Sequence, residues 1–319
     1  MMSGKRAGEM KKGFILRCEL NSEFRSADEY TRQARDWLSG ALAVFDKEVQ
    51  EILEGPALDP RTIQGGVPCG LPGTLWGFCQ VTEQGARGLR ATTKVISEEN
   101  LAWFFKAIGK GVFSAAVGIS RIGENGSPEL RLARITAERE EDLDSWVRLG
   151  CEIPEASITD REFQSRLLEF MKNSAGQLNP AFGHIAYNYT VGKTALEEVL
   201  GPPWLLPEDT LPESRSFLRG YDWVTVCPQE LADRLGGAAE LRATGAFHDV
   251  AELAEGGVWL LATPNHDEYD EERVTRVWSA LSPVIRPGKP KRFSDEVGQP
   301  PLPIVYEDAA QGRNTARPD

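Results

Sequence analysis

Three histidines are the residues whose type would most readily support catalysis or metal binding. His184, His248 and His266 stand in three different predicted elements. None belongs to a pair at the i, i+3 or i, i+4 spacing by which a helix presents two ligands to a zinc ion. A catalytic dyad would need a nucleophile brought beside one of them by folding. We therefore predict no metal site and no catalytic residue from the histidines.

The densest group of carboxylates directly follows His266. Positions 267, 268 and 270 to 272 are all acidic. The central glycine and terminal glutamate of a calcium-binding loop are absent, so we predict no bound metal. An apolar stripe at helical spacing follows, including Val274, Val277 and Trp278, and acidic residues in a first turn stabilise a helix by opposing its dipole. Two interpretations stay open: helix capping, and a docking surface for a cationic partner.

The run Gly192-Lys193-Thr194 stands between a predicted strand and a predicted helix, as a phosphate-binding loop would. Such a loop needs another glycine five positions before Gly192, because wrapped backbone amides hold the phosphate. Position 187 is a tyrosine. We therefore interpret Thr194 as a helix cap and predict no nucleotide cofactor.

Aromatic residues gather around a proline-rich segment at positions 201 to 219. Its prolines exclude a continuous helix, so we expect a surface loop. Trp204 and Tyr221 lie beside this loop and are candidates for exposed anchors of a protein interface, whereas Trp223 and Trp259 are expected in the core. The residues predicted to contact a protein partner are Trp204, Tyr221, Asp222, Asp267, Glu268, Asp270 and Glu271.

Hydrophobic periodicity predicts the elements that would position these residues. Residues 14 to 20 alternate apolar and polar types, as a strand with one buried face does. A capping box at Ser26 and Glu29 opens a helix that runs to Gly55. We further predict a strand at 75 to 81, a helix at 97 to 110, and strands at 112 to 122 and 129 to 137 joined by an Asn-Gly turn.

The pattern then starts again at a constant offset of 133 residues. Cys18-Glu19-Leu20 is followed by a capping box at Ser26, and Cys151-Glu152-Ile153 is followed by one at Thr159. We predict an α+β fold of two tandem similar α/β units, with mainly antiparallel sheets and helices packed on one face. The alternative is a chance agreement between two ordinary strand and helix units.

The predicted boundaries follow from this repeat and from composition. Residues 1–12 form a flexible N-terminus, 13–144 the first unit and 145–285 the second unit. Residues 286–319 are rich in proline and show little periodicity, which predicts a disordered or draped tail.

Composition narrows the class of partner. The formal net charge is −12, which would repel phosphate backbones, so we predict no nucleic-acid partner. A basic protein would be attracted. No apolar run reaches the roughly 20 residues of a membrane helix. The five cysteines include no C-x-x-C pair, which favours a reduced, cytoplasmic compartment.

The second unit resembles the type VI immunity family, bacterial proteins that protect cells from secreted toxins. The resemblance covers about residues 145–285. It rests on Pro180-Ala181-Phe182-Gly183, Arg219-Gly220-Tyr221-Asp222-Trp223, Leu235-Gly236-Gly237 and the hairpin at 250 to 261. The resemblance implies a protein without enzymatic activity that binds and occludes a cognate toxin.

We therefore expect an immunity protein that binds a basic effector or toxin and needs no cofactor. The alternative is an enzyme or small-molecule-binding protein with a site between the two units, near His184, Tyr187 and Tyr221. A third possibility is a cytoplasmic scaffold without a toxin partner.

Overall fold

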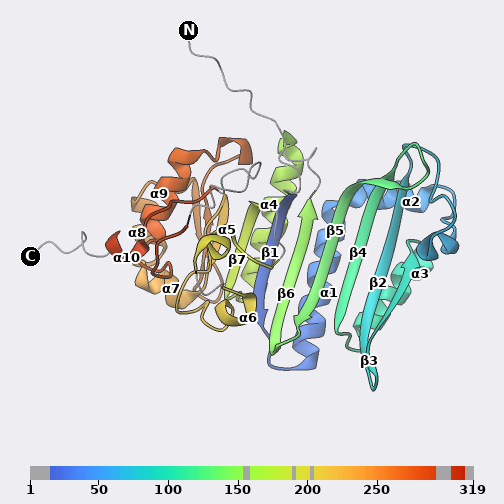
Figure 1. Ribbon diagram of the computed structural model, residues 1–319, viewed down its shortest axis with the longest axis horizontal. Helices are drawn as coiled ribbons and strands as arrows, with labels where there is room; N and C mark the ends of the chain where they lie inside the picture. The colour runs from blue at the N-terminus through green and yellow to red at the C-terminus, as the bar shows by residue number, and fades with distance from the viewer. Residues whose placement is uncertain (1–14, 154–158, 189–191, 202–204, 292–302, 313–319) are drawn as a thin grey trace, which may run out of the picture.

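In the part of the chain that the structure describes, ten strands form one continuous antiparallel sheet in the order β3-β2-β4-β5-β6-β1-β7-β8-β10-β9 (Figure 1). The computed structural model describes residues 15–153, 159–188, 192–201, 205–291 and 303–312. The strands are β1 (Ile15–Glu23), β2 (Leu75–Gly85), β3 (Gly88–Val95), β4 (Ser114–Ile122), β5 (Pro128–Glu140), β6 (Leu143–Ile153), β7 (Phe182–Asn188), β8 (Val224–Cys227), β9 (Asp249–Glu252) and β10 (Val258–Leu261). The predicted α+β class with antiparallel strands is confirmed.

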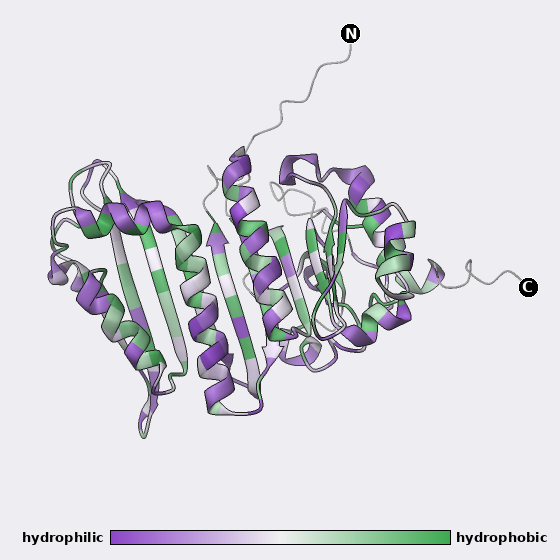
Figure 2. Cartoon of the chain, turned by 180° about the vertical axis from the view of Figure 1, so that it is seen from behind, coloured by the Kyte–Doolittle hydropathy of each residue, from purple (hydrophilic) through white to green (hydrophobic). Residues whose placement is uncertain are grey.

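Helices α1 (Ala27–Val44), α2 (Asp46–Glu54), α3 (Glu98–Ile108) and α4 (Arg161–Leu178) cover one side of this sheet. Figure 2 shows them in front of the strands, and Figure 1 shows the opposite side of β6, β5, β4 and β2 without a covering helix. The main core lies between these helices and the sheet, with Trp37 of α1 and Leu167 of α4 both buried in it.

The second half of the sheet is covered on both sides. The other α-helices of the described residues pack on the side that is open in the first half: α5 (Ala195–Val199), α6 (Pro207–Thr210), α7 (Gln229–Arg234), α8 (Gly237–Ala243), α9 (Glu271–Leu281) and α10 (Ala309–Gly312). A second core cluster joins Phe182 of β7 and Leu260 of β10 to Leu196 of α5 and Val277 of α9. Trp223 and Trp259 are buried in the main core on the other side, as predicted.

The two predicted starts of the repeat meet at the centre of the sheet. Cys18 of β1 lies opposite Cys151 of β6, in a pairing that runs from Leu16 and Ile153 to Glu23 and Trp146. The rings of Trp37 and Phe170, also 133 residues apart, pack at a tilt of 48° with centroids 4.7 Å apart. The strands of the two predicted units interleave, because β6 lies between β5 and β1. The duplication and its boundary stay predictions.

Three details differ from the sequence prediction. The helix expected from Ser26 to Gly55 breaks at Phe45, which is buried and whose ring lies 5.5 Å from that of Phe163. The cap of α4 is Asp160, whose carboxylate accepts the backbone N–H of Phe163, and it replaces the predicted Thr159. Strand β3 was not predicted, because its outer residues are exposed and show weak alternation.

Part of the C-terminal segment packs on the second half. Ile304 and Ala309 are buried, and the backbone N–H of Val305 donates to the Tyr221 hydroxyl at 2.7 Å. Their apolar side chains extend the second core cluster. Among the described helices, none has the length and apolar character needed to cross a membrane.

Candidate functional site

The uncovered side of strands β2, β4, β5 and β6, opposite helices α1 to α4 and with the adjoining strand β1 at its border, is here named the open face. Strand register places its side chains in rows, because directly paired residues point to the same side of a sheet. One row crosses all five strands through Phe78, Gly118, Arg134, Glu152 and Arg17. The open face therefore carries aromatic groups at one end and charged groups at the other.

The aromatic end consists of Trp76 and Phe78 on β2. Both side chains are half-buried, and their ring centroids lie 5.7 Å apart. The Trp76 indole N–H donates to the Thr62 hydroxyl at 2.8 Å, which holds the ring in place. A Cβ at Gly118 would come within 2.3 Å of the Phe78 ring, so glycine allows that ring to lie across the neighbouring strand.

A cavity of about 270 Å³ opens on the charged end of the open face, and we name it the arginine cavity. Glu152 forms its centre: Arg131 contacts this carboxylate at 2.6 Å, and Arg17 at 3.8 Å. The residues that line it are Arg17, Cys18, Glu19, Arg131, Arg134, Thr136, Glu138, Arg148, Gly150, Cys151 and Glu152. Four guanidinium groups and three carboxylates thus line one cavity of a protein with an acidic total charge.

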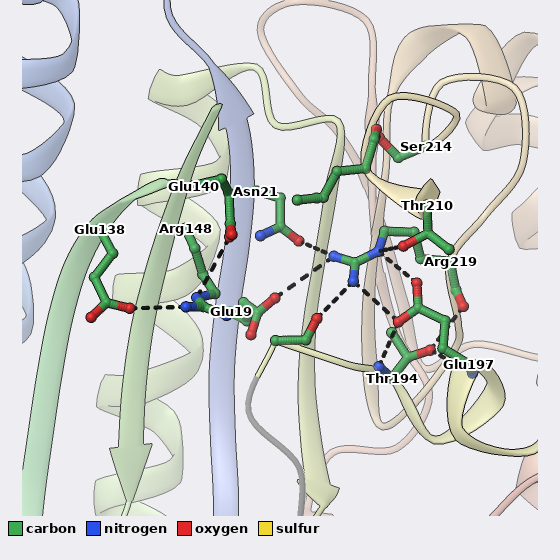
Figure 3. Close-up of polar contacts among 12 residues, drawn as sticks. Glu19, Asn21, Glu138, Glu140, Arg148, Thr194, Glu197, Thr210, Ser214 and Arg219 are labelled. Atoms are coloured by element: carbon green, nitrogen blue, oxygen red, sulfur yellow. Dashed lines mark hydrogen bonds and ion pairs between the residues drawn. The ribbon is translucent and has the colours of Figure 1, made fainter. Parts of the chain in front are cut away.

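A second cavity of about 290 Å³ adjoins the first at Glu138 and Arg148, and we name it the acidic cavity. Its lining is Phe113, Glu138, Arg139, Glu140, Glu141, Asp142, Leu143, Arg148 and Glu208. Arg148 lies between Glu138, at 2.9 Å, and Glu140, at 3.7 Å (Figure 3). Burial raises the pKa of Glu140, while the charge of Arg148 lowers it.

A buried arginine fastens the covered half of the sheet to β1 (Figure 3). The Arg219 side chain is 1% exposed, and Glu197 accepts its Nε–H at 2.8 Å and an Nη2–H at 3.1 Å. Asn21 Oδ1 accepts from Nη1 at 2.6 Å, and the Gly192 carbonyl accepts from Nη2 at 2.8 Å. Arg219 is the first residue of Arg219-Gly220-Tyr221-Asp222-Trp223, one of the motifs on which the family resemblance rests. The arginine of this motif therefore stabilises the fold.

Thr194 caps α5, as predicted. Its hydroxyl accepts the backbone N–H of Glu197 at 3.2 Å, and the Glu197 carboxylate accepts the Thr194 N–H in return. The hydroxyl also donates to the carbonyl of Arg219 at 2.8 Å. The Gly192-Lys193-Thr194 run therefore holds Arg219 in place: the Gly192 carbonyl accepts from its guanidinium, and the Thr194 hydroxyl donates to its backbone carbonyl.

His184 and His266 both lie in largely buried surroundings. His184 is buried beside Glu19, and burial lowers its pKa to about 4. His266 packs edge-on against the Trp223 ring, and burial likewise lowers its pKa to about 4. The described residues include no group of three or more potential metal ligands. Neither His184, Tyr187 nor Tyr221 lines the arginine cavity or the acidic cavity.

The fold is similar to that of a solved structure. That structure is the Pseudomonas aeruginosa T6SS protein PA0821, which superposes with a TM-score of 0.53 at 14% sequence identity. The match covers 94% of this chain and 81% of that one. No protein-family model and no curated protein matches the chain. At this identity the likeness shows a shared fold.

The residues predicted to contact a partner differ in their exposure to solvent. Trp204 lies outside the described residues. Tyr221 and Asp222 are only 2% and 3% exposed, so the expectation of an exposed anchor there is wrong. Their side chains turn inward because the Tyr221 hydroxyl accepts from Val305, and the Asp222 carboxyl accepts the N–H of Trp223 at 2.9 Å.

The other four acidic residues of the predicted set are exposed, and they lie before and within the first turn of α9: Asp267, Glu268, Asp270 and Glu271. Asp270 caps the helix by accepting the N–H of Arg273 at 2.9 Å. Glu268 accepts from the Asn265 amide at 2.5 Å. Asp270 therefore has a structural role, while Asp267 and Glu271 remain open for a partner.

Sequence reasoning missed the open face. Trp76, Phe78, Arg131 and Arg134 were not singled out, although the period-two pattern already placed them on predicted strands. The side of those strands that faces away from the core could have indicated an interface. Aromatic and arginine side chains are enriched at interfaces, and these strands carry them on that side.

Proposed function

We propose that this chain is an immunity protein linked to a T6SS, which binds a protein toxin and blocks it without catalysis. The observation that carries the proposal is the fold likeness to a T6SS protein over 94% of the chain. The resemblance of the second unit to the type VI immunity family supports the same role. The family resemblance implies binding without catalysis, and the proposal adopts that mode of action.

The open face is the proposed contact surface. Half-buried aromatic rings at Trp76 and Phe78 supply apolar area, and Arg131 supplies an exposed guanidinium. Tryptophan and arginine are enriched among residues that dominate binding energy in interfaces. The same side of the sheet in the second half is covered by the chain's own helices, whereas β2, β4 and β5 carry no such cover (Figure 1).

The exposed acidic residues at the start of α9 form a second candidate surface. Asp267 and Glu271 would attract a basic toxin, in agreement with the net charge of −12. The two surfaces can be tested separately, because one lies on the first half of the chain and the other on the second.

The alternative function is binding or conversion of a small molecule. The arginine cavity supports it, since about 270 Å³ lined by guanidinium groups could hold a small anion. A screen of small acids against the purified chain would reveal such a ligand without any protein partner.

The deciding experiment captures the partner from the native host with tagged chain at low and moderate salt. A captured protein counts as the toxin only if its expression alone arrests growth and co-expression of this chain restores growth. Charge reversal at Arg131 and Arg134 tests the open face, and reversal at Asp267 and Glu271 tests the acidic surface. Arg90→Glu is the matched control, because Arg90 is exposed on the hairpin tip at the edge of the sheet. Failure of every captured protein to arrest growth would overturn the immunity role.

A further inference from the structure

The arginine cavity has an excess of positive charge around one carboxylate. Glu152 is contacted by both Arg131 and Arg17. Arg134 lies directly opposite Glu152 on the neighbouring strand and forms no salt bridge with any residue that the structure describes. Two guanidinium groups therefore contact the Glu152 carboxylate, and a third arginine, Arg134, stands opposite it on the paired strand.

The surroundings make this excess costly. The side chains of Arg17 and Glu152 are only 10% and 14% exposed. Burial lowers the pKa of Arg17, which means that its charged form is disfavoured relative to water. Charges interact more strongly where water is partly excluded. An entering anion would offset this cost.

The arginine cavity also has room for an anion. Gly150 lines the cavity, and a Cβ there would come within 2.8 Å of the Thr136 hydroxyl. Glycine therefore keeps the middle of the cavity free of a side chain. A guanidinium presents paired N–H donors that match the two oxygens of a carboxylate.

We propose that the arginine cavity receives an aspartate or glutamate side chain of the protein partner, which pairs with Arg134 and Arg131. This inference rests on the proposed function, because it assumes that the toxin covers the open face. A carboxylate suits the site better than a phosphate dianion, since Glu152, Glu138 and Glu19 already line the cavity and repel a second negative charge.

Position on the sheet favours a partner side chain. Arg134 shares a row with Phe78, two strands away, which corresponds to about 10 Å. A partner protein that covers Trp76 and Phe78 can therefore also reach the arginine cavity, because the two sites lie close together on the open face. The adjoining acidic cavity, which shares Glu138 and Arg148, offers the opposite charge beside it. Alternating charges of this kind select a partner and its orientation.

The first experiment measures the affinity of the captured toxin for the full chain by calorimetry. Arg134→Glu is expected to weaken binding by at least about tenfold, whereas Arg90→Glu leaves it within about twofold. Exchange of the contacting aspartate or glutamate of the toxin for arginine should restore binding to Arg134→Glu. Circular dichroism and the unfolding midpoint establish that both variants fold. Equal affinity of the wild type and Arg134→Glu would overturn the proposal and leave the immunity role intact.

The second experiment needs no toxin and separates the sources of the carboxylate. Sodium acetate is titrated into the isotopically labelled full chain at constant ionic strength, with NMR detection of the arginine Nε–H signals. Acetate is expected to shift the signals of Arg131 and Arg134 and to leave that of Arg90 unchanged. No shift at either arginine would overturn the carboxylate site. A shift without any protein partner in the capture experiment would overturn the partner as its source, and would assign the cavity to a small acid.

Discussion

Cys18 and Cys151 lie directly opposite each other on the antiparallel strands β1 and β6. They stand 133 positions apart, and the rings of Trp37 and Phe170, at the same offset, pack at a tilt with centroids 4.7 Å apart. Cys18 and Cys151 are only 1% and 2% exposed, so the centre of the sheet is well protected from solvent.

Burial predicts the order in which the cysteines react. Cys18, Cys79, Cys151 and Cys227 are buried, and burial raises the pKa of each thiol. Cys69 is partly exposed. We expect iodoacetamide to label Cys69 first in the native protein and the other four only after unfolding, as measured by peptide mass spectrometry. Rapid native labelling of Cys18 or Cys151 would contradict the central placement of β1 and β6.

Arg219 is expected to contribute strongly to stability. Arg219→Ala leaves the buried carboxylate of Glu197 without its partner, which costs about 3–5 kcal/mol of unfolding free energy. Urea unfolding measures this loss. Arg90→Ala, an exposed control, should change stability by less than about 0.5 kcal/mol. The double variant Arg219→Met with Glu197→Gln should be more stable than Arg219→Ala, since it removes the uncompensated charge. A loss below about 1 kcal/mol in Arg219→Ala would refute this role.

Asp222 is expected to make stability depend on pH. Burial raises its pKa to about 8, whereas the unfolded chain has a value near 3.9. The folded state therefore binds more protons between these values, and the contribution of Asp222 falls as pH rises from about 4 to 8. Asp222→Asn keeps an oxygen that can accept the N–H of Trp223 and removes the titration.

Urea unfolding of both proteins at several pH values provides the measurement. The unfolding free energy of the wild type minus that of Asp222→Asn should fall by up to about 1.4 kcal/mol per pH unit across this window. The difference between the two proteins cancels the contributions of other titrating groups. A difference that stays constant with pH would show that Asp222 ionises normally in the folded state.

Two acidic residues at the start of α9 are expected to differ in their effect on stability, because Asp270 caps the helix and Asp267 does not. Asp270→Ala should lower the unfolding free energy by about 1 kcal/mol, because the N–H of Arg273 loses its acceptor. Asp267→Ala, which changes a neighbouring exposed carboxylate, should have little effect on stability. Thermal or urea unfolding of the two variants compares them. Equal destabilisation by both would contradict a specific cap at Asp270.

Local pattern determined much of the secondary structure. The alternation around Cys18 and Cys151 predicted β1 and β6, and the Asn-Gly turn predicted the β4–β5 hairpin, where Gly126 has a φ of +76°. Ser26 and Ser97 cap helices as their types suggest, since a hydroxyl satisfies a free backbone N–H. Such features depend on neighbours in the chain, so the sequence by itself determined them.

Contacts between distant residues depended on the tertiary structure. Arg219 and Asn21 are 198 positions apart, and only the sheet order β6-β1-β7 brings them within 2.6 Å. The same order turned Tyr221 and Asp222 inward and gathered Arg17, Arg131 and Glu152 on the open face. Periodicity shows which side of a strand is polar, because it is a local property. Which polar sides are covered and which stay open depends on the packing of the whole chain.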